Sequence, residues 1–353
     1  REAPKTNTPA YCTLRKLFAS TCNWPIMMTM NSNRVLHGDA VDLLPTIPAQ
    51  SIDLVIADPP YWKVVSEKWD YQWRTEDDYL QWSLGWLQQA TNALRLGGSL
   101  YLFGYFRTLA LIVPHLERMG LELRQQIIID KGIKAVSGRA TKGYKQFPNV
   151  TESVLFMIKD SKPFIRSYLK EQQKRSGLKA KDINERLGVK SNGGGMWSIY
   201  TGDNICEQVP TKELWERLEI VLGFEFPYEK FAQVFNAQMG LSDVWTDIDF
   251  YEEKRFHPTQ KPQKLIRRLI AASTNQGDSI LDPFAGSGAV AVAAEMMGRA
   301  CISIERDRNL FEVICSRITS IKDPLLLMAP SIDSGSTPSV FLGERDRPVR
   351  IPQ

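Results

Sequence analysis

Cysteine and histidine are scarce in this sequence. Its 353 residues include five cysteines and three histidines, with no C-x-x-C pair. Neither a disulfide framework nor a metal-ligand set is therefore indicated. No apolar run approaches the roughly 18 residues that a membrane-spanning helix needs, and the first residues lack the charged-then-apolar order of a signal peptide. We expect a soluble, cytoplasmic protein with no metal and no membrane partner.

The net charge is also small. The whole chain carries only +4, so any surface that binds nucleic acid must be local. One candidate is the window from Lys159 to Lys190, in which ten Lys or Arg stand against four Asp or Glu. A solvated pair of basic helices would have the same composition. With 43% hydrophobic residues, the chain can form one large domain and an insert.

A first motif, Asp58-Pro59-Pro60-Tyr61, follows a run of β-branched and aliphatic residues at 51–57 that predicts a buried strand. An acid thus lies at the carboxyl end of a strand, where open parallel sheets bind ligands. The prolines stiffen the loop, and its carbonyls can accept hydrogen bonds. Beside a tyrosine ring, this loop suits a planar amino group such as the exocyclic amine of a nucleobase. Alone, the four residues equally suit an ordinary proline turn.

A second motif near the end of the chain predicts a cofactor site. Residues 278–282 predict a strand, 283–288 a tight glycine turn and 289–297 a helix, so the backbone can approach a ligand closely. The next predicted strand, 300–304, ends in Glu305, which is placed to accept hydrogen bonds from ribose hydroxyls. Alanine stands where a G-x-G-x-x-G motif has its third glycine. A nicotinamide cofactor and hydride transfer are therefore disfavoured.

Elsewhere, predicted strands alternate with predicted helices. This order indicates an α/β fold with a doubly wound parallel sheet, in which one edge strand can run antiparallel. Gly97 and Gly98 are expected to end the helix that begins at residue 77. We expect further strands at 34–37, 99–103, 125–129 and 153–158, and helices at 77–94, 108–119, 214–222 and 263–272.

The basic window has the pattern of a DNA-binding unit. Residues 179–189 resemble the first helix and glycine turn of a helix-turn-helix, and 191–200 are expected to open its second helix. The loop 131–149 is also basic, and the aromatic segment 224–250 is expected to pack the insert on the main domain. We expect DNA contacts at Lys179, Lys181, Lys190, Asn192, Ser198, Tyr200, Arg139 and Lys142.

Two shorter polar stretches complete the candidate site. The sequence H-P-T-Q-K-P at 257–262 precedes an amphipathic helix, and its polar groups with Lys261 would hold a carboxylate. Taken alone, its histidine, His257, is better interpreted as a residue that caps or fills a turn. Asp39 and Ala40 follow the predicted strand at 34–37, and Asp39 also suits the N-cap of the next helix.

Together these residues resemble the amino-group DNA methyltransferases that use S-adenosylmethionine, in the β arrangement of that family. D-P-P-Y matches 58–61, F-x-G-x-G matches 284–288, and H-P-T-Q-K-P matches 257–262 letter for letter. The resemblance implies a Rossmann-like, seven-stranded methyltransferase sheet with circularly permuted motif order, and a mainly helical target-recognition insert. It divides the chain into an N-terminal arm (1–32), a catalytic half (33–158), the target-recognition insert (159–250), a cofactor half (251–322) and a C-terminal tail (323–353).

The resemblance also implies roles for individual residues. Asp58 and the carbonyl of Pro59 would accept hydrogen bonds from the target amine, and Tyr61 would stack on a base flipped out of double-stranded DNA. Pro60 completes the catalytic motif. The cofactor would be held by Asp39, Ala40, His257, Thr259, Gln260, Lys261, Asp282, Phe284, Gly286, Ser287, Gly288 and Glu305.

The aspartate that begins D-P-P-Y implies N6 of adenine as the target. Three alternative substrates are N4 of cytosine, RNA and a protein side-chain amide. A further alternative is an inactive DNA-binding regulator with this fold. The resemblance further implies a restriction-modification setting, a bacterial or phage-type cytoplasm and a homodimer.

Overall fold

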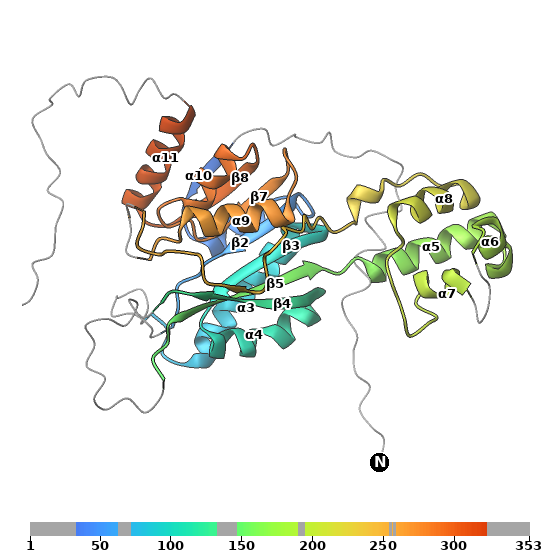
Figure 1. The fold of residues 1–353 in the computed structure, drawn as a ribbon, viewed down its shortest axis with the longest axis horizontal. Coiled ribbons are helices and arrows are strands. Elements are labelled where there is room, and N and C mark those ends of the chain that lie inside the picture. Colours follow the sequence, from blue (N-terminus) through green and yellow to red (C-terminus); the bar gives the residue numbers. More distant parts are fainter. Residues whose placement is uncertain are drawn as a thin grey trace, which may run out of the picture.

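The computed structural model describes residues 33–62, 72–132, 147–189, 195–253, 256 and 259–322. These residues form an α/β domain around one mixed sheet, with a separate group of helices at one end (Figure 1). The sheet order is β1-β8-β7-β2-β3-β5-β4-β6. The strands are β1 (Arg34–His37), β2 (Ile52–Ala57), β3 (Leu94–Gly104), β4 (Leu121–Asp130), β5 (Thr151–Lys159), β6 (Val244–Trp245), β7 (Ser279–Asp282) and β8 (Ala300–Glu305).

The sheet confirms the α/β prediction and corrects two details. The strand of the second motif, β7, lies next to the strand of the first motif, β2, and runs parallel to it. The antiparallel strand is β5, which pairs with β3 and β4 inside the sheet and is not an edge strand. The sheet has eight strands, because the two residues of β6 add to β4 at one edge.

Helices cover both faces of the sheet (Figure 1). On one face α3 and α4 bury Trp86, Leu87 and Leu109 against the strands. On the other face α9 and α10 bury Leu265 and Val290, and α11 packs against α10. The helices are α2 (Ala40–Leu43), α3 (Glu76–Ala93), α4 (Phe106–Arg118), α9 (Gln263–Ser273), α10 (Ala289–Met296) and α11 (Arg308–Lys322), with a 3-10 turn at Leu44–Thr46.

The helix α3 begins and ends at identifiable residues. Thr75 and Asp78 form a reciprocal capping box at its N-terminus. The predicted glycine stop is wrong, because α3 ends at Ala93 and β3 begins at once. Gly97 instead allows a close approach: its φ is +69°, and a Cβ added there would overlap the carbonyl oxygen of Phe231.

The helical insert has its own core. Its helices are α5 (Lys162–Ser176), α6 (Ala180–Arg186), α7 (Gly195–Tyr200) and α8 (Lys212–Leu222), followed by a 3-10 turn at Tyr228–Lys230. Leu169, Ile183 and Trp215 are fully buried among them. The aromatic segment 224–250 is divided: Phe231 packs in this core, while Trp245 packs in the main core.

The insert joins the sheet at the edge where the parallel strands begin. We call this the amino edge; the opposite, carboxyl edge is where β2, β7 and β8 end. β5 runs from one edge to the other, since Ser153 pairs with Gly104 and Ile158 pairs with Ser99. α5 then continues away from the sheet (Figure 1). Arg95 stabilises this junction between the insert and the sheet. Its guanidinium binds Asp53 at 2.6 Å and the carbonyl of Ala232 at 2.9 Å.

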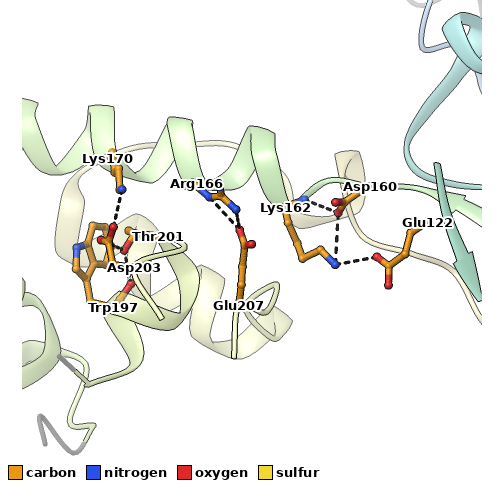
Figure 2. A network of polar contacts seen from close by, with 9 residues as sticks. All are labelled: Glu122, Asp160, Lys162, Arg166, Lys170, Trp197, Thr201, Asp203 and Glu207. Atoms are coloured by element: carbon orange, nitrogen blue, oxygen red, sulfur yellow. Dashed lines mark hydrogen bonds and ion pairs between the residues drawn. The ribbon is translucent and has the colours of Figure 1, made fainter. Parts of the chain in front are cut away.

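Several of the insert's positively charged side chains form ion pairs. Lys162, Arg166 and Lys170 recur every four residues along α5 and bind carboxylates from other segments (Figure 2). Their partners are Glu122, Glu207 and Asp203, in the same order. All three acids lie outside the Lys159–Lys190 window. The excess charge of that window is therefore partly neutralised in the folded protein.

Candidate active site

The predicted catalytic loop lies at the carboxyl edge. β2 ends at Ala57, and Asp58 follows it with its side chain 26% exposed. One carboxylate oxygen, Oδ1, accepts from the hydroxyl of Tyr61 at 2.9 Å. The other, Oδ2, lies 2.8 Å from the ammonium of Lys261. Pro60 is held by its carbonyl, which accepts from the hydroxyl of Tyr79 on α3 at 3.1 Å.

Two further charged residues join this loop, and the sequence prediction missed both. Glu152, the second residue of β5, accepts from the hydroxyl of Tyr61 at 2.7 Å and lies 3.3 Å from the Lys261 ammonium. Its other oxygen accepts from Lys131 at 3.1 Å. An acid within the apolar strand T-E-S-V-L-F-M-I-K was the available signal, since a buried charge is normally paired.

Burial and charge pairing shift the pKa values of this network. Burial raises the pKa of Asp58, although the ammonium of Lys261 opposes that change. Burial also opposes ionisation of Glu152, but Lys261 and Lys131 outweigh it and lower the pKa of Glu152 to about 2. Despite its burial, Lys261 has a raised pKa because Asp58 and Glu152 surround it. Asp58 is thus the carboxyl whose affinity for a proton is increased.

The catalytic loop opens into a cavity of about 1270 Å³ along the carboxyl edge. Residues from both sequence motifs line it, so the fold brings the two motifs to one site. Among the predicted site residues, the lining includes Asp39, Ala40, Asp58, Pro59, Pro60, Tyr61, Thr259, Gln260, Lys261, Asp282, Phe284, Gly286, Ser287 and Glu305.

The glycine turn lies between β7 and α10. Gly286 has a φ of +53°, and a Cβ added there would meet nothing within 4 Å. Its N–H donates to a carboxylate oxygen of Glu305 at 2.7 Å, which ties the turn to the end of β8. Gly288 is not among the residues that line the cavity, and its role at the cofactor stays a prediction. An added Cβ there would lie 3.0 Å from Ile314, so this glycine allows close packing on α11.

The segment before α9 contacts both motifs. Gln260 accepts from the hydroxyl of Ser287 at 2.8 Å, which connects it to the glycine turn. Lys261 was expected to hold the carboxylate of a ligand. It instead binds Asp58 and Glu152 and is only 8% exposed, so its charge already has partners. His257 lies outside the described residues.

Two acids flank the turn. Asp39 is the N-cap of α2, since its carboxylate accepts from the N–H of Val41 at 2.9 Å, and it also lies 3.5 Å from Arg306. Asp282 ends β7 and is 3% exposed. Burial raises the pKa of Asp282 well above its ordinary value. A buried carboxyl facing a cavity is a candidate hydrogen-bonding group for a ligand.

Of the predicted DNA contacts, those in the described ranges lie in the insert and are not brought together with the catalytic loop. Lys179 and Lys181 are exposed in the insert, beyond the amino edge. Ser198 donates to the carbonyl of Gly195 within α7. Tyr200 was predicted to read bases, but it is 3% exposed and packs in the insert core, so that prediction is wrong. Arg139, Lys142, Lys190 and Asn192 lie outside the described residues.

Two features are absent from the described ranges. No group of three His, Cys, Asp or Glu side chains there could hold a metal ion. No helix in those ranges is long and apolar enough to cross a membrane.

The chain is similar to several known proteins. Residues 52–316, more than half of the chain, match the N6/N4 family described as DNA methylase. The DNA adenine methyltransferase YhdJ of Escherichia coli (strain K12) is 28% identical over 293 residues, covering 80% of this chain and 81% of the relative. The type II methyltransferase M.HinfI of Haemophilus influenzae is 25% identical over 331 residues, covering 89% and 77%.

Solved structures are also similar. A crystal structure of the M1.HpyAVI-SAM complex is 18% identical, with a TM-score of 0.49, and the match covers 81% of this chain and 98% of that one. TTHA0409 from Thermus thermophilus, titled a putative DNA modification methylase, is 20% identical with a TM-score of 0.49, covering 83% and 96%.

Proposed function

The chain belongs to the N6/N4 DNA methylase family, and within that family we propose that it methylates the exocyclic N6 amine of adenine in double-stranded DNA. The observation that carries this proposal is the position of Asp58 beside Tyr61, in the same cavity as the glycine turn and Glu305. The relative named DNA adenine methyltransferase supports adenine as the target base.

The cavity fits S-adenosylmethionine, the methyl donor of this family. Its volume of about 1270 Å³ exceeds the roughly 300–1,000 Å³ of typical ligand pockets, which leaves room for a base beside the cofactor. At Gly286 no side chain fills the space above the turn. When bound, S-adenosylmethionine supplies an electrophilic methyl group. The residues that would hold it are Asp39, Ala40, Thr259, Gln260, Asp282, Phe284, Gly286, Ser287 and Glu305.

The catalytic loop would activate the amine. The lone pair of an exocyclic amine is delocalised into the ring, so the amine is a poor nucleophile. Asp58 and the carbonyl of Pro59 would accept its two N–H bonds and draw the nitrogen toward tetrahedral geometry. Tyr61 would stack on the base. A base inside a duplex cannot reach this loop, so the adenine is flipped out.

The insert would add DNA affinity away from the target base. The nine residues of β5 span about 30 Å at about 3.3 Å per residue, which is about nine base pairs at about 3.4 Å each. Lys179 and Lys181 are exposed beyond that point and suit contacts with phosphates. A restriction-modification setting, a homodimer and a cytoplasmic location stay predictions.

Transfer of labelled methyl from S-adenosylmethionine to mixed-sequence duplex DNA, followed by nucleoside analysis, tests the proposal. We expect N6-methyladenine, and its loss in Asp58→Ala. N4-methylcytosine would keep the chemistry but overturn the adenine assignment. Label on RNA or protein alone, or cofactor binding without any product, would overturn DNA methylation.

A further inference from the structure

Resting on the proposed function, we propose that Glu152 is a positioning residue for methyl transfer, which shares the Tyr61 hydroxyl and the Lys261 ammonium with Asp58. In doing so it keeps the Asp58 carboxylate available to the target amine. Glu152 belongs to none of the three sequence motifs and lies on β5, a different strand from the one that Asp58 follows.

The geometry of shared donors carries this inference. The hydroxyl of Tyr61 has one hydrogen but two carboxylate acceptors, Asp58 at 2.9 Å and Glu152 at 2.7 Å. The ammonium of Lys261 likewise lies 2.8 Å from Asp58 and 3.3 Å from Glu152. The same two donors therefore face the same two acids. Each donor can turn toward Glu152 when the amine requires Asp58.

The burial of Glu152 makes this arrangement stable. Glu152 is 9% exposed, and Lys131 binds its second oxygen at 3.1 Å. A buried carboxylate with an ammonium on each side stays ionised. It is therefore a permanent counter-ion for Lys261, whether or not Asp58 is engaged with substrate.

Charged groups from each neighbouring element decide the sign of the effect on Asp58. Its own loop supplies Tyr61, the segment before α9 supplies Lys261, and β5 supplies Glu152. Just after β4, Lys131 faces Glu152, and the end of β7 adds the buried Asp282. Without the charge of Glu152, the Lys261 ammonium and the Tyr61 hydroxyl would act on Asp58 alone. Asp58 would then become a more acidic, weaker hydrogen-bond acceptor.

The first measurement is the titration of the Asp58 carboxyl by ¹³C NMR in the free protein, assigned with Asp58→Asn. In Glu152→Gln, we expect the pKa of Asp58 to fall below the wild-type value. Glu152→Asp, which keeps the charge, should restore most of the difference. Glu122→Gln is the matched control: Glu122 is ion-paired with Lys162 near the amino edge, and its loss should leave the pKa of Asp58 unchanged.

The second measurement is the single-turnover rate on duplex DNA as a function of pH. Glu152→Gln should slow methyl transfer on the order of 10- to 100-fold, because misaligned donors reduce the rate by about that factor. The acidic limb of the pH–rate profile of this variant should also move to lower pH. A slower variant with an unmoved acid limb and an unmoved Asp58 titration would reduce Glu152 to a structural role and overturn the proposal. Unchanged rate and titration would overturn it as well. If wild-type protein methylates no DNA, the proposed function fails, while the titration still shows separately whether Glu152 controls the pKa of Asp58.

Discussion

The two edges of the sheet differ in how they use charge. At the carboxyl edge, the buried side chains of Glu152 and Lys261 join Asp58 and Lys131 in one network that faces a cavity. At the amino edge, Lys162 and Lys170 form partly exposed pairs that hold α5 to neighbouring segments. Burial and pairing act together on pKa values in this network, which favours the carboxyl edge as the place of the proposed chemistry.

This difference bears on the insert. A basic window and a helix-turn-helix pattern predicted that the insert recognises the DNA target. The direction of β5 instead carries the insert to the amino edge, because β5 is antiparallel to β3. Charge in the sequence alone therefore did not locate the surface around the target base.

The largest expected effect is at Asp58. Asp58→Asn should lower the single-turnover rate on the order of 10³-fold. A neutral amide accepts hydrogen bonds from the amine more weakly than a carboxylate does, and it does not stabilise the positive charge that develops on the amine. Binding of S-adenosylmethionine, followed by calorimetry, should persist. A variant that kept near wild-type rates would remove Asp58 from the chemistry.

The next largest effect is expected at the junction between the insert and the sheet, and it is an effect on stability. Gly97→Ala should lower the free energy of unfolding by about 3 kcal/mol, since the new Cβ would meet backbone and the φ angle is strained. Urea denaturation measures this. Gly120→Ala is the control: its φ is +87°, but nothing lies within 4 Å of an added Cβ, so only the backbone strain of about 1 kcal/mol should appear. Equal losses would contradict the close approach.

At the carboxyl edge, Gly286→Ala should weaken cofactor affinity about tenfold, because the added methyl group enters the space that the cofactor needs. Titration calorimetry with S-adenosylmethionine measures this loss. Gly120→Ala again serves as the control for backbone strain and should bind the cofactor normally. Equal weakening in both variants would mean that Gly286 acts only through its φ angle.

The pH dependence distinguishes the two carboxyl groups at the carboxyl edge, because their pKa values shift in opposite directions. Because burial raises the pKa of Asp58 above its ordinary 3.8, and the ionised form is active, the methylation rate should fall as pH drops through that raised value. Glu152, whose pKa is lowered to about 2, stays charged throughout. A single-turnover acid limb at or below pH 3.8 would contradict the raised pKa.

Structural features that depend on neighbouring residues in the sequence were predictable. The strands of both motifs, the cap at Asp39 and the helix after the glycine turn follow from local patterns, and the structure confirms them. Contacts between distant segments were not predictable from one sequence. Glu152 meets Tyr61 across 91 positions, and Lys162 meets Glu122 only because β4 and β5 pair. Tyr200 was predicted to read bases because the sequence alone does not show that it packs in the insert core, which several helices build together.

The division between the edges is tested most directly by DNA affinity on duplexes of two lengths. Wild-type protein and the double variant Lys179→Ala, Lys181→Ala would be compared on duplexes of roughly 12 and 40 base pairs, since the insert lies about nine base pairs from the catalytic edge. We predict that the double variant binds only the long duplex more weakly, with a salt slope reduced by about 2. Equal weakening on both lengths would contradict the account, because the insert would then contact DNA beside the target base.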